Sequence, residues 1–307
     1  MDVRELSLDE LDSRWGGTFA PDGVVGGPPC QSFSQANRSV TSSDPRHELP
    51  LVYARIVRSL NERSALKFIA LENVPGLNNK QNTHHLEALQ AHLEETGFTV
   101  FKATLNARDY STPQSRRRLF VVGLNSKLYP GLVWNPPAFT TDKLEKMTVR
   151  AAIGALPEPR FFGRTQDAGL TEDQHPNHWC MNPKSKRFLT PGALTEGDSR
   201  HRSFKTLAWD KPSLTVAYGN REVHVHPSCK RRLSVYEAML LQGFPVGFEL
   251  LGSLSSQIAQ VSEAVPPTMA EAVARSINDT MERALDFPLR PAPGQSPQAS
   301  SHELLPT

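Results

Sequence analysis

The sequence predicts an α/β fold: a doubly wound, mostly parallel sheet of the Rossmann type, followed by a smaller and irregular domain. Short apolar runs alternate with stretches of helical period over the first part of the chain. The apolar runs end in glycine, proline or asparagine, as strands do where they lead into loops. Beyond residue 128 these periods give way to segments rich in proline and aromatic residues, which predicts a change of architecture.

The first half of the expected sheet is a strand–helix–strand unit. Residues 22–27 form a short apolar run that ends in glycines, and residues 68–71 form a second apolar run. Between them, residues 49–60 have a helical period with one apolar face, made of Leu49, Val52, Ile56, Val57 and Leu60. Two strands joined through a helix predict a parallel pair.

The remaining elements follow in order. A helix is expected at residues 84–96, and strands are expected at residues 99–105 and 118–124, which should pair antiparallel. Further helices are expected at residues 234–242 and 266–284, the second with a single apolar face. The end of the chain is rich in proline and poor in apolar side chains, which predicts a disordered tail.

The composition excludes two classes of protein. The 307 residues include only three cysteines, Cys30, Cys180 and Cys229, which are too few and too scattered for a disulfide framework. No apolar run approaches the roughly 18 residues of a membrane span, and the acidic N-terminus has no secretory pattern. These features predict a protein of the reducing cytoplasm without a membrane partner.

The net charge of +2 conceals a basic region. Between residues 200 and 232, eight Lys and Arg side chains stand against two acidic ones, Asp210 and Glu222. Such a local excess is typical of a surface that binds nucleic acid. The eight basic residues are Arg200, Arg202, Lys205, Lys211, Arg221, Lys230, Arg231 and Arg232.

A cysteine, a carboxylate and two arginines are expected at one edge of the sheet. Cys30 follows the first strand and is a candidate nucleophile where positive charge favours its thiolate. Glu72 follows the second strand and can hold or donate a proton. Arg116 and Arg118 share a face by strand alternation and can bind phosphate or a polar ring edge. A buried structural cysteine and a solvated basic turn are the alternative interpretations.

These pieces, in this order, resemble the DNA (cytosine-5)-methyltransferase family. The family's nucleophile segment Gly-Gly-Pro-Pro-Cys-Gln-x-Phe-Ser is present at residues 26–34, its Glu-Asn-Val at 72–74 and its Gln-x-Arg-x-Arg at 114–118. Asp44-Pro45-Arg46-x-x-Leu49 is similar to the family's helix entry. Residues 232–245 and 260–267 are similar to its last two motifs.

The resemblance implies methyl transfer from S-adenosylmethionine to C5 of a cytosine flipped out of double-stranded DNA, in a restriction–modification system. It implies that Cys30 adds to C6, that Glu72 acts at N3, that Arg118 helps to hold the base and that Arg116 supports the loop. Cofactor contacts are expected from Asp2, Val3, Pro29, Leu49, Asn73, Ser262, Glu263 and Val265. DNA contacts are expected from Gln31, Ser34, Gln114, Arg200, Arg202, Lys205 and Arg221.

The motifs divide the chain into four expected parts. Residues 1–128 would be a partial catalytic domain and residues 129–232 a target-recognition domain. Residues 233–285 would return to pack on the catalytic domain, and residues 286–307 would be a disordered tail. A DNA substrate also implies a nucleoid-associated protein of the cytoplasm.

The chain departs from the family at its beginning. The family starts with an aromatic and glycine-rich cofactor loop, whereas Asp2 here resembles a later residue that contacts the adenine. The expected sheet is therefore N-terminally incomplete, with the strand at residues 22–27 as an exposed apolar edge. A late gene start or truncation, a split enzyme with a complementing N-terminal subunit, and a degenerate copy are the three explanations. We expect that the chain alone does not methylate DNA.

Three further points remain open from the sequence. Ser262 and Glu263 stand where the family has Gly-Asn, which puts a carboxylate close to the expected carboxylate of the cofactor. A zinc site is conceivable from six residues at short spacings, although the spacings match no standard finger: His175, His178, Cys180, His224, His226 and Cys229. The main alternative function is a catalytically silent, DNA-binding remnant of a methyltransferase.

Overall fold

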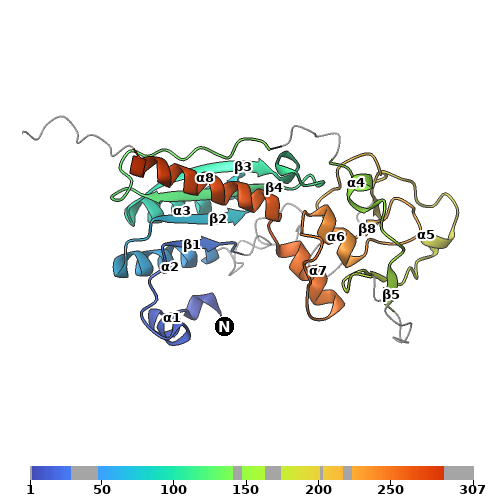
Figure 1. Cartoon of the computed structure of the whole chain (residues 1–307), viewed down its shortest axis with the longest axis horizontal. Coiled ribbons are helices and arrows are strands. Elements are labelled where there is room, and N and C mark those ends of the chain that lie inside the picture. The colour runs from blue at the N-terminus through green and yellow to red at the C-terminus, as the bar shows by residue number, and fades with distance from the viewer. Residues whose placement is uncertain are drawn as a thin grey trace, which may run out of the picture.

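The computed structural model describes residues 2–28, 48–140, 147–162, 174–200, 203–216 and 223–286, which are called the described residues below. The expected tail and the helix entry at Asp44-Pro45-Arg46 lie outside them. The described elements form two groups that lie side by side along the long axis of the molecule (Figure 1). One is built on a four-stranded sheet and the other is made of short helices and strands.

The sheet contains β1 (Gly23–Gly26), β2 (Phe68–Asn73), β3 (Phe98–Asn106) and β4 (Arg117–Asn125), in the order β1-β2-β4-β3. β1 and β2 are parallel, as the strand–helix–strand pattern predicts. β4 is antiparallel to both β2 and β3, because β3 and β4 form a hairpin whose second strand inserts next to β2. Over the described strands the sheet is therefore mixed, and the expectation of a mostly parallel sheet is wrong for this part of the chain.

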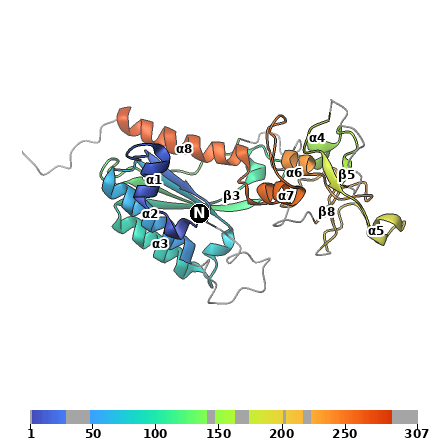
Figure 2. The ribbon, with the colours of Figure 1, turned by 90° about the horizontal axis from the view of Figure 1, so that it is seen from below.

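Helices cover both faces of the sheet, as Figure 2 shows. α2 (Leu49–Arg63) and α3 (Thr83–Glu95) pack on one face against Ile69 and Leu71, while α8 (Pro267–Asp286) packs on the other face near Ala70. Successive residues of a strand point to opposite faces, and β2 is apolar at both sets of positions because both faces are buried. The helices and strands expected up to residue 124, and the last helix, are thus confirmed within a few residues at each end.

The N-terminal segment packs beside α2 rather than over the sheet. It contains a 3-10 helix, η1 (Val3–Glu5), and α1 (Leu8–Trp15). Ser7 accepts the backbone N–H of Glu10 and so caps α1, while Gly16 ends it in a left-handed conformation with φ +79°. The side chain of Arg55 in α2 donates to the carbonyl of Arg4 and holds η1 in place.

The second group has its own apolar core. It contains α4 (Val149–Ile153), α5 (Lys186–Leu189), α6 (Val235–Leu241) and α7 (Leu254–Glu263), together with four short strands. Side chains of α4, α6 and α7 share this core with Leu207 and Val216. The four short strands form two parallel pairs: β5 (Arg160–Phe162) with β6 (Trp179–Met181), and β7 (Lys205–Thr206) with β8 (His224–Val225).

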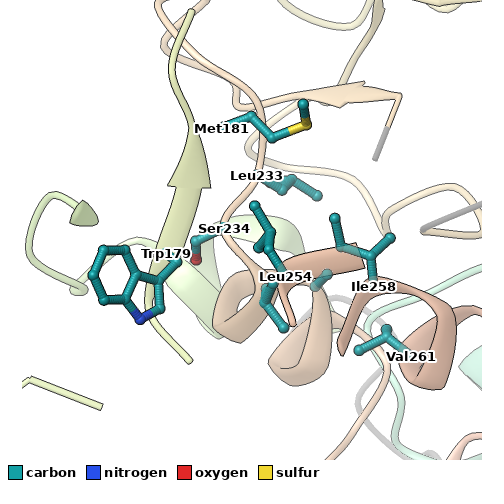
Figure 3. Close-up of a pocket in the computed structure, with 9 residues that line it drawn as sticks. Trp179, Met181, Leu233, Ser234, Leu254, Ile258 and Val261 are labelled. Carbon is teal, nitrogen blue, oxygen red and sulfur yellow. The ribbon is translucent and has the colours of Figure 1, made fainter. Parts of the chain in front are cut away.

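The seam between β6, α6 and α7 is closely packed. Figure 3 shows Leu233, Leu254, Ile258 and Val261 converging on it, with Trp179 and Met181 from β6 at its side. The remaining cavity measures about 10 Å³, which is the space of one water molecule at most. This seam is structural packing and does not offer room for a ligand.

β1 lies at the edge of the sheet, and only its β2 side is paired among the described residues. β1 consists of two valines between two glycines, and the side chain of its second valine, Val25, is 76% exposed. The expected exposed apolar edge is therefore present in the structure. No described helix is both long and apolar enough to cross a membrane.

Candidate functional site

Glu72 and Arg118 meet at one end of the sheet because of the strand register. Glu72 lies opposite Phe120 in the antiparallel β2–β4 pair, and Arg118 stands two residues before Phe120 on the same face of β4. The Nε of Arg118 lies 2.6 Å from the Oε1 of Glu72, and both side chains are largely buried. The two predicted site residues are therefore brought into direct contact.

Burial controls the protonation of Glu72. Desolvation raises the pKa of the Glu72 carboxyl above its usual value, and the charges of Arg118 and Arg116 oppose this effect without reversing it. A carboxyl group with a raised pKa stays protonated to higher pH than an exposed one. Glu72 can therefore present a proton to a ligand at this edge of the sheet.

The end of β1 runs directly beside Glu72. A Cβ atom placed on Gly27 would lie 3.5 Å from the Oε2 of Glu72. The Nδ2 of Asn73 donates to the carbonyl of Pro28 at 3.2 Å, so the end of β2 also fixes the chain that leaves β1. Pro28 precedes Cys30 by two residues in the sequence, and Cys30 itself lies outside the described residues.

Tyr53 of α2 fastens the two parallel strands at this end, a role that the sequence analysis missed. Its hydroxyl lies 3.0 Å from the carbonyl of Val24 and 3.3 Å from that of Ala70. A Cβ atom on Gly26 would come within 2.7 Å of the Tyr53 ring, so this position of β1 requires glycine. In the sequence, Tyr53 lies next to the apolar face predicted for this helix, and that position could have indicated its contact with the sheet.

Arg116 precedes Arg118 by two residues, but it makes no hydrogen bond to Glu72 in the structure. It is 1% exposed, and its guanidinium donates to the carbonyls of Ser262 and Ala264 at 2.8 and 3.0 Å. These carbonyls end α7 and lead into α8. The geometry makes Arg116 a residue that positions the α7–α8 turn, while a catalytic role for it stays a prediction.

Gln242, at the end of α6, holds the same turn and was not anticipated. Its side chain is fully buried, and its Nε2 donates to the carbonyls of Val261 and Ala264, both at 2.8 Å. The last carbonyls of a helix have no partner inside it, so Gln242 and Arg116 together satisfy them. The signal in the sequence was a polar residue inside an apolar run directly before Gly243.

An apolar cavity of about 480 Å³ opens beside Glu72, between the sheet and α8. Val25, Gly27 and Phe120 line it from the sheet, and Val265 lines it from the α7–α8 turn. Its volume is that of a site for a small organic molecule. Glu72 and Asn278 are the polar side chains in its lining among the described residues.

The predicted cofactor residues divide between this cavity and other places. Val265 lines the cavity, and Asn73 lies at its end of β2, where it binds Pro28. Leu49 starts α2, Ser262 offers its carbonyl to Arg116, and Glu263 is exposed at the end of α7.

The two predicted cofactor residues at the N-terminus lie elsewhere, since Asp2 and Val3 belong to the segment beside α2. Asp2 forms an ion pair with Arg4, and this pairing lowers the pKa of the Asp2 carboxyl to about 2. Pro29 is outside the described residues.

The predicted DNA contacts are likewise dispersed. Gln114 is fully buried, and its amide makes no hydrogen bond to the described part of the chain. Its backbone pairs with Ser213, which ties the hairpin to the second group of elements. Arg200 is 86% exposed and paired with Asp198, and Lys205 is half-buried in β7. Gln31, Ser34, Arg202 and Arg221 lie outside the described residues.

The histidines and cysteines considered for zinc have other partners. His178 binds Ser234 and the carbonyl of Pro157, and His175 stacks on Tyr236 at 3.9 Å between ring centroids. Cys180 is fully buried, and its thiol donates to the carbonyl of Arg232. No group of three His, Cys, Asp or Glu side chains in the described segments could hold a metal ion.

Comparison with known proteins identifies the family. The model of the C-5 cytosine-specific DNA methylase family matches residues 2–279. The Type II methyltransferase M.FnuDI of Fusobacterium nucleatum is 30% identical over 301 residues, which cover 91% of this chain and 81% of that protein. M.MthTI of Methanothermobacter thermautotrophicus is 31% identical over 286 residues, covering 86% and 80%.

Solved structures agree on the fold. A crystal structure from E. coli, described as a putative DNA modification methyltransferase encoded within a prophage, matches with a TM-score of 0.71 at 20% sequence identity. The match covers 92% of this chain and 85% of that one. The Dnmt2 methyltransferase of S. pombe matches with a TM-score of 0.56 at 14% identity, covering 94% and 84%.

Proposed function

Because the chain belongs to the C-5 cytosine-specific DNA methylase family, and is a DNA cytosine-5-methyltransferase that uses S-adenosylmethionine, we propose that Cys30 and Glu72 carry its reaction. The contact of Glu72 with Arg118 at the end of β2, beside the strand that leads to Cys30, is the observation that carries the proposal. The substrate is a cytosine flipped out of double-stranded DNA, since C6 is inaccessible within a stacked duplex.

The proposed chemistry follows from the poor nucleophilicity of cytosine C5. The Cys30 thiolate adds to C6, and Glu72, whose pKa is raised by its burial, donates a proton at N3. These two events make C5 electron-rich, and S-adenosylmethionine supplies an electrophilic methyl group. Loss of the C5 proton to solvent, departure of the Cys30 thiolate and return of the N3 proton to Glu72 then restore the ring and the acid. Arg118 fixes the orientation of Glu72 and helps to hold the base.

The cavity beside Glu72 fits part of S-adenosylmethionine. Its volume and its apolar wall, which includes Val25, Phe120 and Val265, suit the adenine ring. The ribose hydroxyls and the methionine carboxylate need polar partners, and the lining offers only Glu72 and Asn278 as polar side chains among the described residues. We therefore assign to this chain the apolar side of the cofactor site, with Val265 as its main contact from the α7–α8 turn.

We propose that a further polypeptide segment completes this site. The edge of β1 that no described strand pairs, the exposed Val25 and the adjoining apolar cavity together form a surface that a strand with apolar side chains would cover. The same segment, either continuous with this chain or in a partner subunit, would bring polar groups that the described lining does not supply. Val25→Lys should then weaken assembly with the complementing segment without unfolding the chain, because this side chain is already exposed.

Residues 129–232 are proposed as the target-recognition domain. Their short elements pack with α6 and α7 around a core separate from the sheet. The hairpin that carries Arg118 is hydrogen-bonded to them through Ser115 and Ser213. DNA bound between the two groups would meet the recognition surface and the catalytic residues at once. The Type II names of the relatives favour a place in a restriction–modification system.

Covalent trapping tests the proposal. Genomic DNA in which 5-fluorocytosine replaces cytosine should form a stable adduct with the complemented enzyme, because fluorine at C5 cannot leave as a proton. We expect the adduct on Cys30, and its loss in Cys30→Ser. Label transfer to DNA by Cys30→Ser would remove Cys30 as the nucleophile. DNA binding without any transfer in the complemented enzyme would instead support a silent remnant.

A further inference from the structure

An aromatic and cationic cluster lies in the second group of elements, outside the site described above. Phe188 of α5 and Phe204 pack with ring centroids 5.6 Å apart. The guanidinium carbons of Arg187 and Arg232 lie 5.1 and 4.7 Å from the centroid of the Phe204 ring. Two arginines thus share one aromatic side chain, an arrangement that fixes the orientation of both guanidinium groups.

The two arginines of this cluster have different surroundings. Arg232 is half-buried, and its Nη1 donates to the carbonyls of Ser203 and Val223 at 2.9 and 2.8 Å. Arg187 is exposed and forms no ion pair with the described carboxylates. Arg232 therefore anchors Phe204, and Phe204 in turn holds the exposed guanidinium of Arg187.

The charged side chains that flank Arg187 along the described chain are all basic. Described residues 174–195 contain no Asp or Glu, and Lys184 and Lys186 are exposed beside Arg187. The nearest acidic residues along the chain are already engaged: Glu196 accepts the backbone N–H of Trp209, and Asp198 is paired with Arg200. The segment of α5 is therefore a small positive surface that carries no acidic residue of its own within described residues 174–195.

We propose that Arg187, held by Phe204 and flanked by Lys184 and Lys186, binds the phosphate backbone of the DNA duplex. A guanidinium presents several N–H donors in a plane and matches two oxygens of one phosphate. Because Phe204 already restricts its rotation, less conformational entropy is lost when the phosphate binds. The inference rests on the proposed function only in taking duplex DNA as the substrate.

Salt-dependent DNA binding tests this role apart from catalysis. The full chain is titrated against a fluorescein-labelled duplex of mixed sequence, by anisotropy, at salt concentrations from about 50 to about 200 mM. Arg187→Ala should weaken binding about tenfold at the lowest salt, as expected for one charge-assisted hydrogen-bonding group. The slope of log K against log salt should become shallower by about 0.9, the value for one lost phosphate contact. Arg187→Lys should keep the slope but bind more weakly than the wild type.

The matched control is Lys127→Ala. Lys127 is also exposed, but it follows the distant end of β4, away from Glu72 and from the second group of elements. This variant should bind DNA as the wild type does. Unchanged affinity and slope in Arg187→Ala would overturn the assignment of Arg187 while leaving the catalytic proposal intact. Failure of the wild-type chain to bind any duplex would instead overturn both DNA-binding proposals.

Discussion

The Nε of Arg118 lies 2.6 Å from the Oε1 of Glu72, and this ion pair joins β4 to the end of β2. The pair is mostly shielded from water, yet the pKa of Glu72 is raised because the cost of burying its charge exceeds the stabilisation by the arginine. β2 carries Asn73 to the chain after β1, and Arg116, directly before β4, reaches the α7–α8 turn. The β2–β4 pair and the residue before β4 therefore connect Glu72, the chain that leads to Cys30 and the turn that forms one wall of the cavity.

Glu72→Gln should remove most of the methyl transfer activity of the complemented enzyme. The amide cannot donate a proton as an acid does, and general acid catalysis contributes about 10²- to 10⁴-fold to a rate. The measurement is label transfer at saturating DNA, with the affinity for DNA determined in parallel. Glu271→Gln, an exposed substitution on α8, is the control. A rate within about threefold of the wild type would exclude the proton-donating role of Glu72.

Arg116→Met should destabilise the protein as well as lower its activity. The substitution keeps an apolar stem but removes the donor of Arg116 from the partly buried carbonyl of Ser262 and leaves Ala264 with the donor of Gln242, at a cost of about 2 kcal/mol in the free energy of unfolding. Urea denaturation followed by circular dichroism gives this value. Arg283→Met, which removes an exposed contact to the carbonyl of Asp279 and a partly buried one to the hydroxyl of Thr280, should cost far less because both contacts stay within one turn of α8. Full stability in Arg116→Met would contradict its positioning role.

Cys180 should resist alkylation in the native protein. It is fully buried, and burial raises the pKa of its thiol to about 12, so very little thiolate exists near neutral pH. Treatment with iodoacetamide followed by peptide mass spectrometry should find Cys180 modified only after unfolding. Modification of Cys180 at the rate of a small exposed thiol would show that this core opens readily.

His226 should make the protein less stable on the acid side of neutrality. Burial lowers the pKa of its imidazole below the usual 6.5, although Glu237 partly opposes this. At His226 the unfolded chain therefore binds a proton more readily than the native chain. The contribution of His226 to the free energy of unfolding is complete above pH 6.5 and is lost as the pH falls through its native pKa. Thermal unfolding of His226→Asn between about pH 7.5 and about pH 5.5 should show a shallower decline than that of the wild type. His92→Asn, an exposed substitution on α3, should retain the wild-type slope.

Local periodicity was sufficient for most of the sheet-bearing part. Leu49 to Leu60 repeats at helical spacing and forms α2, and the apolar runs at residues 22–27 and 68–71 form β1 and β2. α7 escaped the sequence analysis because its buried residues, Ile258 and Val261, are too few to produce a clear period. The short strands β5 to β8 were equally hidden, since two or three residues carry no pattern of their own.

The motif segments fixed the family and the types of the reactive groups, because those depend on residues that are close together in the sequence. The sequence alone determined that a carboxylate follows the second strand and that two arginines alternate along the fourth. Only the tertiary structure separated the two arginines. The β2–β4 register brings Arg118 to Glu72, whereas the turn between α7 and α8 lies against Arg116 and offers it the carbonyls of Ser262 and Ala264. Two identical side chains, two residues apart in the sequence, thus have different environments. The environment of each arginine is set by the distant segment that packs against it, and the local sequence does not specify that segment.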